Sequence, residues 1–192
     1  MKNFKRHLST AIFVIIALAI LVPIGIWQGK KDLYIQSLEQ KIQEFEQAEK
    51  EKMDVDTAKM ADDNEGVMHK ISSIESSHNP NAVSPAGARG QYQIMKSTWD
   101  ECVELMKVDW DYDTCWNDPV KNRAVGEYYF FKRIPAMLKA YDIPDNTETR
   151  LACYNGGIGR IVSAYRENPT HWKDHLPQET QQYIIKYTKR EL

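Results

Sequence analysis

The amino-acid sequence predicts an all-α domain that is preceded by a transmembrane helix and a helical stalk. Three observations predict it: an uncharged apolar stretch near the start, a charged segment without proline, and a remainder in which apolar residues recur at helical spacing. The 192 residues, 42% of them hydrophobic, suffice for one compact domain and an appendage but hardly for two full domains. The net charge of −2 gives no electrostatic reason to expect nucleic acid as a partner.

The apolar stretch from Ala11 to Trp27 follows a basic N-terminus. As a helix it would span about 25 Å, slightly less than the ~30 Å hydrocarbon core of a bilayer. This pattern is typical of a signal anchor, with the positive end inside and everything after Lys31 outside. We therefore expect residues 1–29 to place a single-pass protein in the inner (cytoplasmic) membrane. A cleaved signal peptide is the alternative, although the small residues Ala17-Leu18-Ala19 lie inside the apolar run.

Residues 30–63 are rich in Glu, Gln, Lys and Asp and contain neither glycine nor proline. This composition predicts a solvated helical stalk that holds the following domain away from the bilayer. An apolar seam with 3-4-3 spacing, about two heptads long, runs through Ile35, Leu38, Ile42 and Phe45. A weak dimerising coiled coil is therefore the alternative, because two heptads are marginal alone.

The three cysteines, Cys102, Cys115 and Cys153, form neither a CxxC pair nor a Cys/His cluster. We therefore expect no metal site. Outside the cytoplasm, a disulfide between Cys102 and Cys115 would close a short loop and stabilise the fold by about 3 kcal/mol. Two free buried thiols are an equally open interpretation.

Residues 64–192 show the composition of one globular helical domain. Capping residues at 62–65 predict the start of a helix that carries Met68, Ile71 and Glu75 and stops near Asn79-Pro80. The further helices that we expect are Ser97 to Met106, a helix after the cap Asn117-Asp118-Pro119 that Pro135 kinks or interrupts, Asn146 to Tyr154, Arg160 to Tyr165, and Gln178 to Lys189. The only β-structure expected is at most a small hairpin near Ala86 to Gln93.

Glu75 continues the apolar stripe of Met68 and Ile71 at the C-terminal end of its predicted helix. An apolar surface removes water from the charged carboxylate, and a helix C-terminus disfavours negative charge, so both effects raise its pKa. Such an acid can deliver a proton near neutral pH. An ordinary exposed glutamate at a helix end is the alternative when this pattern is taken alone.

Three motifs, which follow one another along the chain, favour Glu75 as a functional acid over an ordinary exposed glutamate. They are Glu75-Ser76 with Ser84, the glycine turn 87–90 and Gln93-Ile94; Tyr154-Asn155-Gly156; and Leu176-Pro177-Gln178-Glu179-Thr180 followed by Tyr183. In these segments the chain resembles the lytic transglycosylases of the soluble-lytic-transglycosylase type, relatives of goose-type lysozyme. The likeness covers about residues 64–189 and implies a single lysozyme-like catalytic domain.

The resemblance implies a role for each matching residue. Glu75 is expected to be the catalytic acid/base, with Ser84 and Gln93 lining the sugar site and Tyr154 as a hydrogen-bonding neighbour of the carboxyl. Asn155 is expected to be a structural or substrate contact, and Tyr183 to approach the site from the last helix. Ser84 and Asn155 could instead cap backbone turns, and Tyr183 could simply pack in the core.

The sequence departs from the family pattern at two places. Gln91-Tyr92 replaces an apolar pair, and His78 stands where an aromatic residue is common. These two changes affect the expected shape of the substrate cleft but not the expected role of Glu75. We expect His78 to be a packing or surface residue.

The resemblance implies cleavage of the β-1,4 bond between N-acetylmuramic acid and N-acetylglucosamine in peptidoglycan glycan strands, leaving 1,6-anhydromuramic ends and needing no cofactor. A hydrolytic, lysozyme-like muramidase is one alternative, and it would need a base from the aspartates at 109, 111, 113 or 118. A non-catalytic wall-binding assembly module is another. The expected partners are glycan strands and, through the N-terminal helix, the membrane. No residue selects for or against an envelope-spanning assembly.

Overall fold

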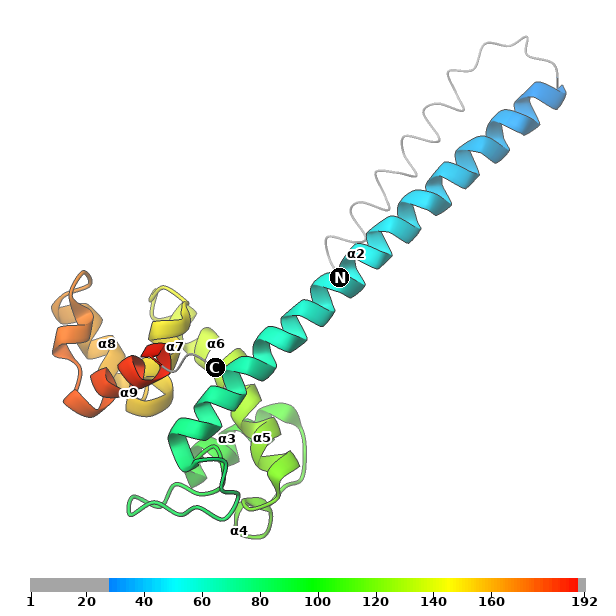
Figure 1. Ribbon diagram of the computed structural model, residues 1–192. Coiled ribbons are helices and arrows are strands. Elements are labelled where there is room, and N and C mark those ends of the chain that lie inside the picture. The colour runs from blue at the N-terminus through cyan, green and yellow to red at the C-terminus, as the bar shows by residue number, and fades with distance from the viewer. Residues whose placement is uncertain (1–27, 190–192) are drawn as a thin grey trace. The chain divides into compact units, whose positions relative to one another are not determined.

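The computed structural model describes residues 28–189, and every regular element in this range is helical (Figure 1). The helices are α2 (Gln28–Ser76), α3 (Lys96–Met106), α4 (Tyr112–Cys115), α5 (Pro119–Tyr128), the π-helical turn η1 (Tyr129–Arg133), α6 (Ile134–Ala140), α7 (Thr147–Gly156), α8 (Ile158–Glu167), the 3-10 turn η2 (Trp172–His175) and α9 (Gln178–Lys189). The all-α prediction is thereby confirmed. Instead of the small hairpin, residues 28–189 contain two isolated bridges, Val83 with Arg89 and Arg89 with Ile94.

The chain divides into two units between Asp62 and Asp63, and α2 continues through the boundary. The predicted helix start at residues 62–65 is therefore wrong: these capping residues lie inside one helix. Their side chains can also stand on an exposed helix face, and no proline or glycine precedes them to break it. None of the helices between residues 28 and 189 is long and apolar enough to cross a membrane. The predicted anchor, Ala11 to Trp27, lies outside the described residues.

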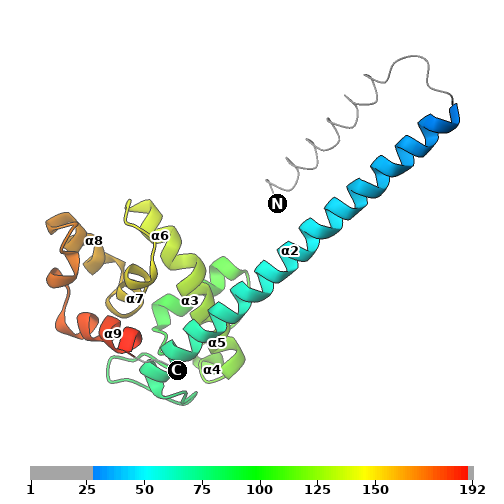
Figure 2. The same cartoon turned by 45° about the horizontal axis from the view of Figure 1, so that its top comes forward.

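The second unit is built from two groups of helices. Helices α3, α4 and α5 form one group, and α7, α8 and α9 form the other, with η1 and α6 between them (Figures 1 and 2). The largest fully buried side chains include Trp99 from the first group, Leu151 and Ile161 from the second, and Phe130 and Leu138 from η1 and α6. One continuous apolar core therefore joins the groups.

The predicted interruption at Pro135 takes the form of a π-helical turn. Proline has no N–H and its ring crowds the carbonyl one turn earlier, so a regular α-helix cannot pass through it unchanged. The residues before it, Tyr129–Arg133, widen into η1, and α6 then begins at Ile134 with Pro135 in its first turn. This turn faces the site through Tyr129 and Phe130, whose rings pack against Tyr154.

The loop between α2 and α3 is held by a buried asparagine. Asn122, only 1% exposed, accepts a hydrogen bond from the Tyr92 N–H (2.9 Å) and donates one to the Arg89 carbonyl (3.2 Å). Gly90 has a φ of +82°, and a Cβ built there would lie 2.2 Å from Asn122 Nδ2 and 2.6 Å from the Trp116 carbonyl oxygen. Only glycine fits this close approach of the loop to α5.

Gly90→Ala is expected to lower the free energy of unfolding by about 2 kcal/mol more than Gly87→Ala, because overpacking adds to backbone strain. Gly87 is the matched control, since it has a φ of +89° but no atom within 4 Å of the built Cβ. Urea denaturation of both variants measures the difference. An equal loss of unfolding free energy in the two variants would show that the loop relaxes away from Asn122.

All three cysteines are free, buried thiols. Of the two interpretations left open by the sequence, the structure shows free thiols at positions 102 and 115. Burial raises the pKa of Cys102 and of Cys153 to about 12, so neither thiol is ionised at neutral pH. The Lys121 ammonium donates to Cys115 Sγ at 3.2 Å.

Candidate active site

Glu75 lies one residue before the end of α2, on the stripe that buries Met68 and Ile71 completely. The helix stops there because Ser77 and His78 adopt left-handed conformations, with φ of 54° and 64°. Their N–H groups donate to the carbonyls of Ser73 and Ser72, both at 3.2 Å, which satisfies the last carbonyls of the helix. The acid therefore sits at a rigid helix end rather than on a loop.

The carboxyl of Glu75 has the electrostatics of a general acid. Its pKa is raised to about 7: burial raises it most, the Tyr183 hydroxyl lowers it, and the neighbouring carboxylate of Glu179 raises it. The dominant cause is the loss of water around the charged form. The expectation of a raised pKa, drawn from the apolar stripe, agrees with this environment.

Tyr154 stands beside the acid, and its hydroxyl donates to the Tyr92 carbonyl at 2.8 Å rather than to the carboxyl. Burial and then the charge of Glu75 raise the Tyr154 pKa well above its ordinary value, so the phenol stays protonated. Its ring packs against Tyr129 and Phe130, with centroids 5.5 Å and 6.0 Å away. Tyr154 thus links η1, the loop and the acid.

Tyr183 reaches the acid from α9, as the resemblance implied, and its side chain is 5% exposed. Its buried hydroxyl lies close enough to lower the pKa of Glu75 but makes no regular hydrogen bond to any described residue. Thr180, one turn earlier, has a buried hydroxyl in the same condition. A Cβ at Gly156 would lie 3.0 Å from that hydroxyl, so α7 and α9 approach very closely here.

Ser84 and Gln93 are occupied in holding the loop. The Ser84 hydroxyl accepts a hydrogen bond from the Ala88 N–H at 3.0 Å. The Gln93 side chain donates to the carbonyls of Gly90 (2.8 Å) and Ala82 (3.2 Å), and its backbone is left-handed, with a φ of 48°. Both side chains therefore hold the shape of the loop, and the amide oxygen of Gln93 accepts no hydrogen bond from the described residues.

Asn155 and His78 complete the set of residues discussed from the sequence. Asn155 is half-buried next to Tyr154, and its side chain makes no hydrogen bond to the described residues. His78 is exposed and its ring nitrogen Nδ1 lies 3.0 Å from the Ser72 hydroxyl, with the ring 4.5 Å from that of His69. This placement agrees with the expected surface role.

A hydrogen bond ties the loop directly to the end of α2. The Ser76 hydroxyl donates to the Gln91 carbonyl at 2.9 Å and accepts from the Asn79 N–H at 3.0 Å. Because Ser76 follows Glu75 immediately, the hydrogen bond from Ser76 to the Gln91 carbonyl fixes the position of the loop relative to Glu75. This contact is a structural reason for having a serine directly after Glu75.

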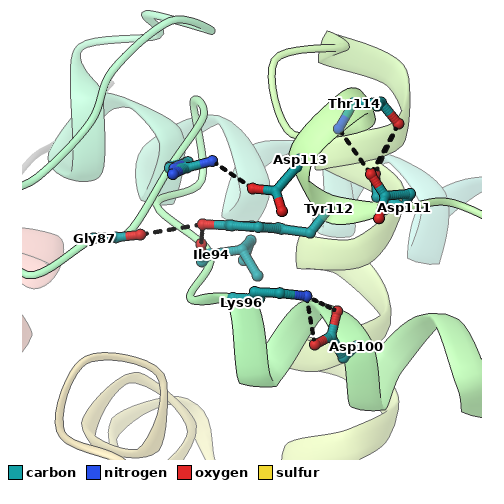
Figure 3. Close-up of polar contacts among 9 residues, drawn as sticks. Gly87, Ile94, Lys96, Asp100, Asp111, Tyr112, Asp113 and Thr114 are labelled. Atoms are coloured by element: carbon teal, nitrogen blue, oxygen red, sulfur yellow. Dashed lines mark hydrogen bonds and ion pairs between the residues drawn. The ribbon is translucent and has the colours of Figure 1, made fainter.

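Tyr112 on α4 is a positioning residue that the sequence analysis missed. Its hydroxyl lies 3.1 Å from the Gly87 carbonyl and 3.0 Å from that of Ile94, so it closes the loop at both ends (Figure 3). The Lys96 ammonium lies 5.7 Å and the Arg89 guanidinium 5.2 Å from the centroid of its ring. No local pattern around an isolated tyrosine indicates such a contact.

Glu179 was also missed, although it stands inside the quoted motif before Tyr183. It is the carboxylate whose charge acts on Glu75. Its spacing of four residues from Tyr183, on the same face of α9, was the available signal. Together, the fold and the site define a helical domain with a desolvated carboxylic acid beside the buried Tyr183 and the half-buried Tyr154.

The family model described as Transglycosylase SLT domain matches residues 55–176. The chain therefore belongs to the transglycosylase SLT domain family. The match contains Glu75 and Tyr154, whereas Tyr183 lies beyond its end.

The curated relatives include proteins named membrane-bound lytic murein transglycosylase F from two strains of Histophilus somni, each 28% identical over 128 residues. The alignment covers 62% of this chain but only 25% of each relative. This chain thus spans about a quarter of their length.

Among solved structures, the 70 kDa soluble lytic transglycosylase of Escherichia coli is similar, with a TM-score of 0.53 and 25% identity over 64% of this chain and 20% of that chain. An inactive mutant of the lytic transglycosylase Slt from Pseudomonas aeruginosa has a TM-score of 0.54 at 20% identity, covering 68% of this chain and 22% of that one. The second likeness concerns the fold alone. Both agree with the expected lysozyme-like architecture.

Proposed function

We propose that this protein is a peptidoglycan lytic transglycosylase that cleaves the bond between N-acetylmuramic acid and N-acetylglucosamine and leaves a 1,6-anhydromuramic end. The observation that carries the proposal is the desolvated carboxyl of Glu75, whose pKa of about 7 lets it be protonated or ionised at neutral pH. Membership of the transglycosylase SLT domain family supports the choice of substrate.

In the first step, Glu75 gives its proton to the oxygen that links the two sugars. The bond from that oxygen to the anomeric carbon of the muramic residue breaks, and the N-acetylglucosamine end leaves as an alcohol. The acetamido carbonyl oxygen of the substrate stabilises the electron-poor anomeric carbon, so no second carboxylate is needed.

In the second step, the ionised Glu75 takes the proton of the muramic C6 hydroxyl, and that oxygen bonds to the anomeric carbon. The ring closes without water because the nucleophile belongs to the substrate and is already oriented. Glu75 ends the cycle protonated. The half-buried Tyr154 and the buried Tyr183, which stay neutral, limit the water around the acid.

Three of the four aspartates that could supply a base for hydrolysis are engaged in structural contacts, and the fourth, Asp109, is exposed. Asp111 caps α4 and Asp118 caps α5, while Asp113 forms an ion pair with Arg89 at 3.0 Å. Each of these three carboxylates therefore has a structural role. This distribution favours the substrate-assisted route over hydrolysis.

Mass spectrometry of sacculi digested with the full chain tests the proposal. A transglycosylase yields 1,6-anhydromuropeptides, which borohydride does not reduce. Reducing ends that take up label from borohydride would instead identify a hydrolase. Unchanged sacculi would leave the wall-binding module as the function.

We further propose that the predicted N-terminal anchor keeps the catalytic domain on the extracytoplasmic side of the inner membrane. The basic residues before the apolar stretch support this orientation. The name membrane-bound carried by the Histophilus somni relatives supports the same location. A weak stalk dimer through the Ile35 to Phe45 seam and participation in an envelope-spanning assembly stay predictions.

The pH dependence of cleavage is expected to respond to the neighbours of Glu75 in opposite directions. The reaction begins with protonated Glu75, so kcat/KM falls as pH rises through its pKa of about 7. Glu179→Gln removes a like charge, lowers that pKa and moves the fall to lower pH. Tyr183→Phe removes the hydroxyl that lowers it and moves the fall to higher pH. Profiles of kcat/KM from pH 5 to 9 measure both shifts, and shifts of the same sign would contradict this account.

A further inference from the structure

The N-terminal part of α2 carries an apolar stripe on an otherwise solvated helix (Figure 1). The stripe, the stalk seam, consists of Ile35, Leu38, Ile42 and Phe45. At about 100° per residue of an α-helix, these side chains fall within an arc of about 80°. Ile35 and Phe45 are 41% and 57% exposed, and none of the four belongs to the apolar core described for residues 28–189. Such a stripe is a surface that another helix can cover.

The residue types in the stalk seam favour a two-stranded pairing of parallel helices. Isoleucine occupies both a positions of two heptads, Ile35 and Ile42, and Leu38 occupies the first d position. β-branched residues at a with leucine at d favour parallel dimers. Glu49 and Lys52 stand at the next a and d positions, so the seam ends after about two heptads and the pairing is weak.

The charges beside the stalk seam fit a second copy of the same chain. In a parallel pair, position g of one helix lies beside position e of the next heptad on the other helix. Lys41 is at g and Glu46 is at that e position, and both side chains are exposed. Two identical chains in register therefore place Lys41 of each copy beside Glu46 of the other. An antiparallel pair would instead bring lysine toward lysine and glutamate toward glutamate, which costs energy.

We propose that the stalk seam pairs with the stalk seam of a second copy as a short parallel coiled coil. Parallel pairing brings the two N-terminal ends together, as two chains anchored in one membrane require. The anchor proposed above raises the local concentration of the stalks, which favours a pairing that two heptads support only weakly in solution. The pairing goes beyond the proposed function, because it does not depend on the chemistry at Glu75.

Sedimentation equilibrium of the full chain in detergent micelles measures the dissociation constant of the dimer. Leu38→Ser is expected to raise it about a hundredfold, because each dimer loses two buried leucines. Leu33→Ser is the matched control, since Leu33 is 68% exposed on the opposite face of the helix, and it is expected to leave the constant unchanged. A wild-type chain that stays monomeric would overturn the proposal, as would equal effects of the two serines.

Charge reversal tests the parallel register in the same assay. Lys41→Glu and Glu46→Lys each turn two attractions into repulsions and are expected to raise the dissociation constant about tenfold. The double variant exchanges the charges and is expected to restore the wild-type value. Glu44→Lys, which lies away from the seam, is the control and is expected to have no effect. Single variants without effect, or a double variant in which the two losses add, would reject the parallel pair, while the cleavage of sacculi tests the proposed function separately.

Discussion

Glu75→Gln is expected to lower the cleavage of sacculi by a factor of about 10³, within the range that a positioned general acid contributes. The amide has nearly the shape of the protonated carboxyl, so the packing against Met68 and Ile71 is retained. It can neither give a proton to the glycosidic oxygen nor take one from the C6 hydroxyl. The release of 1,6-anhydromuropeptides, quantified by mass spectrometry over time, measures the loss.

Glu179→Gln provides the matched control, because it removes a carboxylate beside Glu75 and leaves the proposed proton donor in place. We expect this control to keep its activity near pH 6 within a few-fold of the wild type. Full activity of Glu75→Gln would reject Glu75 as the acid/base. Loss of activity in both variants would point to a shared role of the two carboxylates.

Glu75→Gln is also expected to stabilise the fold at pH 8 by up to about 3 kcal/mol. The folded protein holds the proton of Glu75 more tightly than the unfolded chain, because its pKa rises from 4.5 to about 7 on folding. Below pH 4.5 the group is protonated in both states and has no effect. As pH rises toward 7 the unfolded chain ionises first, so stability falls by ~1.36 kcal/mol per pKa unit of difference.

Urea denaturation at pH 4.5 and pH 8 measures this gain. The variant and the wild type are expected to differ little at pH 4.5 and clearly at pH 8, where the wild type carries a buried charge. The exposed Glu39→Gln on the stalk part of α2 controls for the general loss of one negative charge. A gain that is equal at both pH values would show that packing, not ionisation, is responsible.

Much of the fold could be predicted because its signals are local. Asp118 caps α5 and Pro119 occupies its first turn, and Asn146 caps α7 with a capping box to Thr149. These ends depend on hydrogen bonds between residues two or three positions apart, which the sequence displays directly. The start at residues 62–65 failed because the same residue types are also tolerated on the exposed face of a long helix.

The site was predicted only in part, for a physical reason. Glu75 and Tyr183 were named because motifs carry them, yet the sequence did not say that the Ser84 hydroxyl accepts from Ala88 or that Tyr154 donates to the Tyr92 carbonyl. These hydrogen bonds depend on how the loop folds back on α2. The spacing of Glu179 from Tyr183 was a signal in the sequence, but only the packing of α9 beside the acid brings its charge to Glu75.

The sequence by itself determined the helical class, the apolar stripe that ends in Glu75 and the order of the three motifs, because periodicity and capping act over a few residues. Only the tertiary structure decided that α9 and α7 meet at Gly156, that Tyr112 closes the loop, and that the cysteines stay apart. Such contacts join residues distant in the chain. Their energies exist only once the core has excluded water and fixed the distances between helices.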